Sequence, residues 1–160
     1  MRNIDNFKKA QALINKIAKI RRELSKINYN KSWMVLPDFV ECYARDRFNL
    51  ELKNAEGYDG IGKNDKKRYQ VKYTILKGID KKGEKKFTHT LDNIKPNKFD
   101  FLIAVILDEN YNIIEVFKIP HDVVCQYLRK YKSGYSFRIE KAINEGKLDR
   151  YRVDIIKKEC

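Results

Sequence analysis

Cysteine, proline and glycine are all scarce in this chain of 160 residues, which contains three, three and seven of them. The cysteines at positions 42, 125 and 160 are odd in number and far apart, so the sequence shows neither a disulfide framework nor zinc-ligand spacing. So little proline and glycine, together with 42% hydrophobic residues, excludes a disordered, collagen-like or linker-rich chain. At this length we expect one compact domain over residues 1–160.

Long apolar runs are also missing. No stretch approaches the roughly 20 apolar residues of a membrane-spanning helix. The N-terminal residues MRNIDNFKKAQ lack the short apolar core of a secretory signal. We therefore expect a cytoplasmic protein without a membrane partner.

The chain is poor in acidic residues, with 22 against 35 lysines and arginines, so its formal net charge is +13. The excess is uneven: residues 1–31 carry +7 and residues 77–98 carry +4, whereas residues 99–117 contain no lysine or arginine. Lysines that only keep the surface hydrated account for part of this excess. A small domain this basic nevertheless indicates a polyanionic partner, for which nucleic acid is the usual candidate and a membrane surface the other.

Apolar residues at three- and four-residue steps predict a long amphipathic helix within residues 1–31. They are Ile4, Phe7, Ala10, Leu13, Ile14, Ile17, Ile20, Leu24 and Ile27. This apolar face is more typical of a core or dimer surface than of a membrane-surface helix. A second helix is expected from Pro37 to about Arg47, and it contains Glu41.

From residue 48 onward the period changes to two, which is typical of strands. Strands are expected at residues 48–52, 57–62, 67–76, 99–107 and 113–119. The near-continuous apolar run at residues 99–107 predicts a strand covered on both faces, at the centre of the sheet. Pro120 is expected to open a helix that reaches Leu128, and a strand, a short helix and a last strand should follow at residues 135–156. This order indicates a mixed sheet with helices on it.

Asp59, Gln70 and Lys72 are the residues most suited to chemistry. A tight turn at residues 63–66 brings the strand of Asp59 beside the strand of Gln70 and Lys72, so a carboxylate, an amide oxygen and an ammonium group should converge. Oxygen ligands hold a hard divalent cation such as Mg²⁺, which neutralises charge during phosphodiester hydrolysis. A lysine can orient or deprotonate the attacking water.

At these residues the sequence resembles the PD-(D/E)xK nuclease superfamily, in its variant with glutamine in place of the second acid. The segment GYDGIGKNDKKRYQVKY is similar to the family's metal-binding hairpin, and FDFLIAVILDENYNIIEVFKIP is similar to the hydrophobic strand pair that follows it. The resemblance covers residues 36–132, the expected core, and leaves a basic C-terminal extension at residues 133–160. It implies an α/β, restriction-endonuclease-like fold, in which a mixed central β-sheet is flanked by α-helices.

The resemblance also implies roles for single residues. Asp59 corresponds to the principal metal ligand, Gln70 to a weaker ligand, Lys72 to the catalytic lysine and Glu41 to an auxiliary ligand. Mg²⁺ is the implied cofactor, with Mn²⁺ as an alternative ion. Tyr58 stands where the family has a proline that does no chemistry, and Gln70 departs further because an amide brings no negative charge to the metal.

These observations predict a metal-dependent endonuclease that cuts double-stranded DNA, as in a restriction or other defence system. One chain carries one site, so cutting both strands favours a homodimer. The alternatives are a non-catalytic nucleic-acid-binding protein on the same scaffold and a structure-selective nuclease of the junction-resolvase type.

The segment at residues 77–98 is expected to form a loop or hairpin that contacts DNA phosphates. It contains seven lysines, of which the predicted DNA contacts are Lys77, Lys81, Lys82, Lys85 and Lys86. The two histidines, His89 and His121, lie in different segments, which excludes a paired-histidine metal site.

Overall fold

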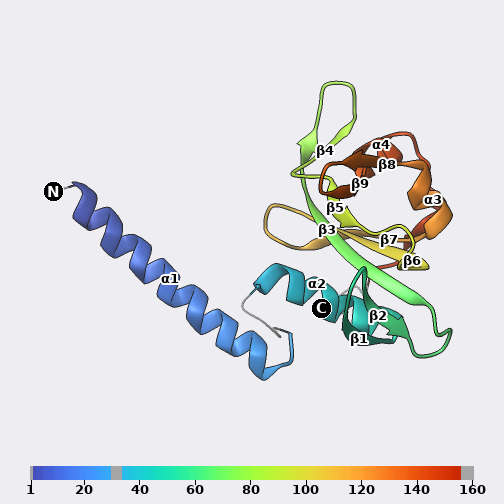
Figure 1. The fold of residues 1–160 in the computed structure, drawn as a ribbon. Coiled ribbons are helices and arrows are strands. Elements are labelled where there is room, and N and C mark those ends of the chain that lie inside the picture. Colours follow the sequence, from blue (N-terminus) through green and yellow to red (C-terminus); the bar gives the residue numbers. More distant parts are fainter. Residues whose placement is uncertain (1, 30–33, 156–160) are drawn as a thin grey trace. The chain divides into compact units, whose positions relative to one another are not determined.

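The computed structural model describes residues 2–29 and 34–155, and the chain divides into two compact units, Met1–Cys42 and Tyr43–Cys160 (Figure 1). None of the helices in these described ranges combines the length and the apolar character that a membrane crossing requires.

The first unit contains the long helix that the sequence predicts. Helix α1 spans Arg2–Lys26, and it ends because Asn28 adopts a left-handed conformation (φ 60°). The backbone nitrogen of Tyr29 then donates to the carbonyl oxygen of Leu24 (2.9 Å), a bond that caps the last turn. Helix α2 (Val35–Phe48) begins in this unit and continues into the second. It starts two residues before Pro37, which the first turn of a helix tolerates.

The second unit is built on a mixed sheet with the strand order β1-β2-β3-β6-β7-β10. Its strands are β1 (Leu50–Ala55), β2 (Tyr58–Gly62), β3 (Arg68–Ile79), β6 (Phe101–Leu107), β7 (Ile113–Pro120) and β10 (Arg152–Val153). Strands β3 and β6 run parallel, and the other neighbours run antiparallel. The five strands expected up to residue 119 are all present, with ends that shift by up to three residues.

Between β3 and β6 the chain makes its parallel crossover with strands instead of a helix. Strand β3 continues into a hairpin with β4 (Lys85–Phe87), which extends beyond the rest of the unit at the top of Figure 1. Strand β5 (Leu91–Ile94) then joins a second, three-stranded sheet of order β5-β9-β8. The loop or hairpin expected at residues 77–98 is therefore a hairpin followed by a strand.

The second sheet and two short helices cover one face of the central sheet. This layer consists of β5, β8 (Leu128–Tyr131), β9 (Gly134–Phe137), α3 (His121–Gln126) and α4 (Ile139–Asn144), followed by the 3₁₀ turn Asp149–Tyr151. The core joins Leu102, Ala104 and Ile106 of β6 to apolar side chains of this layer, such as Phe137 and Val124. The predicted helix from Pro120 to Leu128 is wrong at its end, because Leu128 already begins β8.

Strand β6 lies inside the sheet, as its apolar sequence predicts. Every residue of the strand from Leu102 to Leu107 has an exposed fraction of 0%. Side chains on both faces are therefore covered, as expected for a strand at the centre of a sheet. The protein is thus a mixed α/β protein whose central mixed sheet is flanked by helices.

Candidate functional site

The hairpin of β2 and β3 places the residues that the sequence singles out. Gly60 pairs with Tyr69 and Ile61 with Arg68, so the same register brings Asp59 next to Gln70. The turn between the strands is held by Asp65, which accepts hydrogen bonds from the backbone of Lys67 (3.0 Å) and the hydroxyl of Tyr69 (2.5 Å). These bonds fix the register on which the site depends.

The turn held by Asp65 also explains why residue 62 is a glycine. A Cβ atom at Gly62 would collide with the carboxylate of Asp65, so any other residue there would displace the turn. The pKa of Asp65 lies below its usual range, because Tyr69 and the backbone of Lys67 donate to the ionised carboxylate.

Asp59 bonds directly to the backbone of the neighbouring strand. Its Oδ2 atom accepts a hydrogen bond from the backbone nitrogen of Val71 at 2.6 Å. Val71 lies between Gln70 and Lys72 in sequence, so the carboxylate is held beside both residues. The structure thus brings Asp59 to the part of β3 that carries Gln70 and Lys72.

Gln70 has a buried side chain with one unsatisfied polar atom. The residue is 4% exposed, and its Oε1 atom is buried and accepts no hydrogen bond in the part of the chain that the structure describes. Leaving a buried acceptor unpaired costs on the order of 1–3 kcal/mol, so such atoms are rare and need an explanation. An amide oxygen in this position suits a bound cation or a bound water.

Further along β3, side chains also bond to the backbone of the strand, beside the backbone bond from Thr88 to the carbonyl oxygen of Ile75 (2.9 Å). Ile75 donates from its backbone nitrogen to the Oγ1 atom of Thr88 (3.3 Å), and the Nε2 atom of His89 lies 3.0 Å from the carbonyl oxygen of Tyr73. Alternate residues of a strand direct their N–H and C=O groups to opposite edges, so these bonds and that of Val71 lie on one edge. Between β2 and β4, this edge is therefore lined with functional groups.

Lys72 is half-buried, and Ala104 of β6 lies opposite it. Asp92 of β5 interacts electrostatically with Lys72. Hydrogen bonds from Ser136 and Thr90 lower the pKa of Asp92, and the positive charges of His89 and Lys72 lower it further. A pocket of about 420 Å³ opens beside Asp92.

The sequence alone does not identify Thr88 and His89 at this edge, or Asp92 of β5, whose carboxylate interacts electrostatically with Lys72. They occur within residues 77–98, where the lysines alone predict a function. The usable signal was the concentration of polar side chains in THTLDN directly after the lysine run. Their position beside β3 depends on the crossover, which the local sequence does not reveal.

Glu41 lies on α2, as predicted, and is half-buried. It belongs to the first unit, whereas Asp59 belongs to the second. Its role as an auxiliary ligand stays a prediction.

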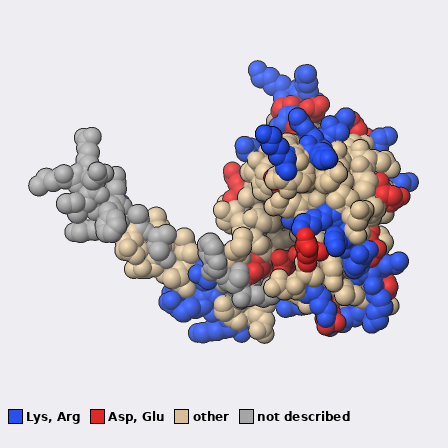
Figure 2. Space-filling model, viewed as in Figure 1, with Lys and Arg blue, Asp and Glu red and all other residues tan. Residues whose placement is uncertain are grey.

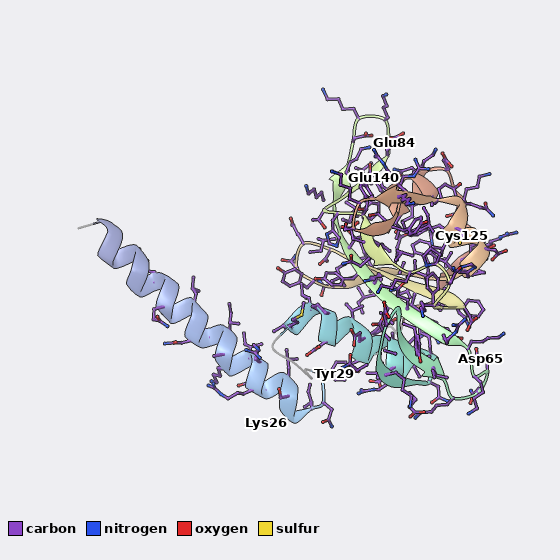
Figure 3. All side chains as sticks on the ribbon, viewed as in Figure 1. Lys26, Tyr29, Asp65, Glu84, Cys125 and Glu140 are labelled. Carbon is purple, nitrogen blue, oxygen red and sulfur yellow. The ribbon has the colours of Figure 1, made fainter. Side chains whose placement is uncertain are left out.

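The five lysines predicted to contact DNA fall into two groups. Lys85 and Lys86 form ion pairs: Lys85 contacts Glu115 (2.7 Å), and Lys86 contacts Glu84 and Glu140 (3.1 Å each). The labels in Figure 3 place Glu84 and Glu140 together beside the hairpin. These carboxylates raise the pKa of Lys86.

Lys77, Lys81 and Lys82 form the second group. All three are exposed, and none forms an ion pair within the described ranges. Figure 2 shows basic side chains projecting at the end of the β3–β4 hairpin, above acidic ones. Asp80 orders this end, because its Oδ1 atom accepts from the backbone nitrogens of Lys82 (2.9 Å) and Glu84 (3.0 Å).

The residues described here contain no group of three or more His, Cys, Asp or Glu side chains that could hold a metal ion. Asp59 and Gln70 together offer one carboxylate and one amide oxygen. Comparison with models of known protein families gives no match, and comparison with curated proteins gives no match either.

Proposed function

We propose that the protein is a metal-dependent DNA endonuclease, as in a restriction or other defence system. The observation that carries this proposal is the position of the Asp59 carboxylate, bonded to the backbone of Val71, next to the buried and unpaired amide oxygen of Gln70. A negative charge and an unsatisfied acceptor on adjacent strands form a partial cage for a hard cation.

The residues present fit Mg²⁺, or Mn²⁺ in its place. Mg²⁺ is bound by oxygen atoms and commonly keeps several waters, so one or two protein ligands are enough when substrate phosphate supplies others. Asp59 and Gln70 would hold it, and the role of Glu41 as an auxiliary ligand stays a prediction. When bound, the ion would neutralise charge that develops on the scissile phosphate.

Lys72 is proposed to act on the water that attacks the phosphorus atom. It lies two residues after Gln70 on β3, so both side chains leave the same face of the strand. An ammonium group there can orient the water, accept its proton after losing its own, and offset charge on the phosphate. Lys72 in this arrangement is the catalytic residue, and Asp92 provides an opposite charge that would restrain its ammonium group.

DNA is the proposed substrate because of charge. The net charge of +13 favours a polyanion. Of the exposed lysines, Lys77 lies on the strand that bears Lys72, and Lys81 and Lys82 lie in the turn that follows this strand. A hairpin of this kind can follow the phosphate backbone or enter a groove. Since each chain offers one site, cleavage of both strands of a duplex is proposed to need a homodimer.

Two structural features agree with the resemblance to PD-(D/E)xK nucleases. The segment similar to the metal-binding hairpin forms β2 and β3, and the segment similar to the hydrophobic strand pair forms β6 and β7. A restriction-endonuclease-like fold is therefore the fold we propose within the mixed α/β class.

The proposal is tested by incubating the purified chain with supercoiled plasmid DNA in Mg²⁺, in Mn²⁺ and in chelator. Nicking or linearisation that requires the metal and disappears in Lys72→Ala supports it. Binding of DNA without cleavage under every condition would overturn it in favour of a non-catalytic nucleic-acid-binding protein. Cleavage of four-way junctions in preference to linear duplexes would assign a structure-selective nuclease instead.

A further inference from the structure

Helix α1 and Ile27, the residue directly after it, present a row of exposed apolar side chains. Leu13, Ile17, Ile20 and Ile27 have exposed fractions between 49% and 63%, although large aliphatic side chains are normally covered. Together with Leu24 they follow one another at steps of four, three, four and three residues. This is the spacing of a coiled-coil seam, in which each side chain packs between those of a facing helix.

We propose that α1 pairs in an antiparallel arrangement with α1 of a second copy of this chain. The seam is its own best partner because an apolar stripe of heptad spacing fits an identical stripe related by a two-fold axis. The antiparallel arrangement that overlaps the helical part of the stripe, Leu13 to Leu24, most fully places Ile17 of one copy level with Ile20 of the other. Leu24 then lies level with Leu13 of the second copy.

Charges beside the seam select the antiparallel direction. With Ile17 and Leu24 at heptad position a, Lys16 and Glu23 occupy the two g positions and Arg21 an e position. Parallel helices would bring Lys16 close to Arg21 of the second copy, which is repulsive. Antiparallel helices bring Lys16 close to Glu23 of the second copy, and symmetry creates this pair twice.

Lys16 and Glu23 are exposed and form no ion pair within the part of the chain that the structure describes. Both are therefore available to a facing helix. This inference does not depend on the nuclease proposal, since it uses no residue of the candidate site, but it gives the proposed homodimer a surface.

The oligomeric state of the full chain tests the inference, measured by sedimentation equilibrium over a range of concentrations. Wild type is expected to dimerise. Ile17→Asp combined with Ile20→Asp should raise the dissociation constant by at least about a hundredfold, because carboxylates would be buried in the seam. Asn15→Asp adds a carboxylate on the opposite side of the same helix and should leave the constant unchanged.

Charge reversal tests the direction. Lys16→Glu should weaken the dimer roughly tenfold, Glu23→Lys should do the same, and the two changes together should restore it. Lys19→Glu is the matched control, because it changes the charge equally away from the seam. If Lys16→Glu tightens the dimer instead, the helices are parallel and the proposed arrangement is wrong.

Two results would overturn the inference altogether. One is a monomeric wild type at all concentrations, and the other is a dimer that survives Ile17→Asp with Ile20→Asp. Binding of the monomer to vesicles of anionic lipid, lost in the same seam variant, would assign the stripe to a membrane surface. The DNA-cleavage assay of Lys72→Ala tests the candidate site alone, and the oligomeric state tests the pairing of α1 alone. Either proposal can therefore fail without affecting the test of the other.

Discussion

The Oδ2 atom of Asp59 lies 2.6 Å from the backbone nitrogen of Val71, so one carboxylate both joins β2 to β3 and holds negative charge beside Gln70. The hydrogen bond to Val71 and the proposed binding of a metal ion require different properties of this side chain. Any oxygen acceptor can receive the hydrogen bond, whereas only an anion neutralises a divalent cation. Substitutions that keep the acceptor and remove the charge therefore separate the two roles.

Asp59→Asn should abolish metal-dependent DNA cleavage while the melting temperature stays within about two degrees of wild type. Its amide oxygen can still accept from Val71, but it brings no charge to the metal. Asp59→Ala should lose the same activity and also about 1–2 kcal/mol of unfolding free energy, because the backbone N–H loses its acceptor. Plasmid cleavage and denaturant unfolding measure the two quantities. An active Asp59→Asn protein would remove Asp59 from the metal site.

Gln70→Glu should make the stability of the protein depend on metal. Without a cation, a carboxylate at a position only 4% exposed is costly to ionise, so the melting temperature in chelator should fall by several degrees. With Mg²⁺ the added charge should tighten binding, and the melting temperature should rise more than in wild type.

Thermal unfolding in chelator and at increasing Mg²⁺ concentration measures this effect. Gln70→Met is the matched control, since it keeps the side-chain length but removes the oxygen ligand, and it should show no metal-induced rise at the site. Equal responses to Mg²⁺ in all three proteins would show that the unpaired Oε1 atom of Gln70 does not face a cation.

Strands with a clear local sequence pattern could be predicted from the sequence. The layer of short strands and helices that covers the central sheet could not. The alternation of β3 is specific to a strand, and the apolar run of β6 has the length of a strand and polar residues on both sides, so both strands are predicted correctly. Apolar residues continue past α3 and predict a helix at Leu128, yet pairing with Phe137 makes this residue part of a strand. Such pairing depends on a partner nine residues away, which periodicity alone does not encode.

The candidate site, like the fold, could be predicted only where its residues are close in sequence. Asp59 and Gln70 lie on consecutive strands joined by a tight turn, so their proximity follows from local sequence. His89 reaches Tyr73 only through the crossover, over a separation of 16 residues. The ion pair of Lys85 with Glu115 is likewise long-range, which explains why five lysines looked equivalent in sequence although their surroundings differ.

The division of these lysines predicts different effects on DNA binding. Replacing Lys77, Lys81 and Lys82 by alanine should flatten the slope of log affinity against log salt by roughly 2 to 3 units, because each phosphate contact releases about 0.9 of a counterion. Affinity should fall evenly across DNA sequences. Binding in Ca²⁺ at several salt concentrations measures the slope, since Ca²⁺ commonly supports binding without turnover.

Alanine at Lys85 and Lys86 provides the comparison. Their ion pairs should hold them to the protein, so this variant should change the salt slope by less than about 1 unit and lower the stability instead. The reverse result, with the larger slope change in the Lys85 and Lys86 variant, would place the DNA contact at the base of the hairpin and not at its end.

Asp100 predicts how stability responds to acid. It accepts hydrogen bonds from the backbone nitrogen of Arg68 (2.8 Å) and from its guanidinium (3.2 Å), at the point where β3 and β6 begin to pair. These contacts, with the guanidinium first, hold the pKa of Asp100 below its usual value. A lowered folded-state pKa stabilises the protein above the unfolded pKa of about 3.9, and this contribution is lost as the pH falls through the folded value.

Asp100→Asn should therefore lower the unfolding free energy by about 1 kcal/mol at pH 7, because the partly exposed ion pair is lost while an oxygen acceptor remains. The difference from wild type should persist down to about pH 4 and shrink as the pH falls further, where Asp100 itself becomes protonated. Urea unfolding between pH 2.5 and pH 7 measures it. Glu109→Gln is the control, because it removes an exposed carboxylate without a described partner, and it should leave the unfolding free energy unchanged. If the difference between wild type and Asp100→Asn stays constant down to pH 2.5, the charge of Asp100 contributes nothing to stability.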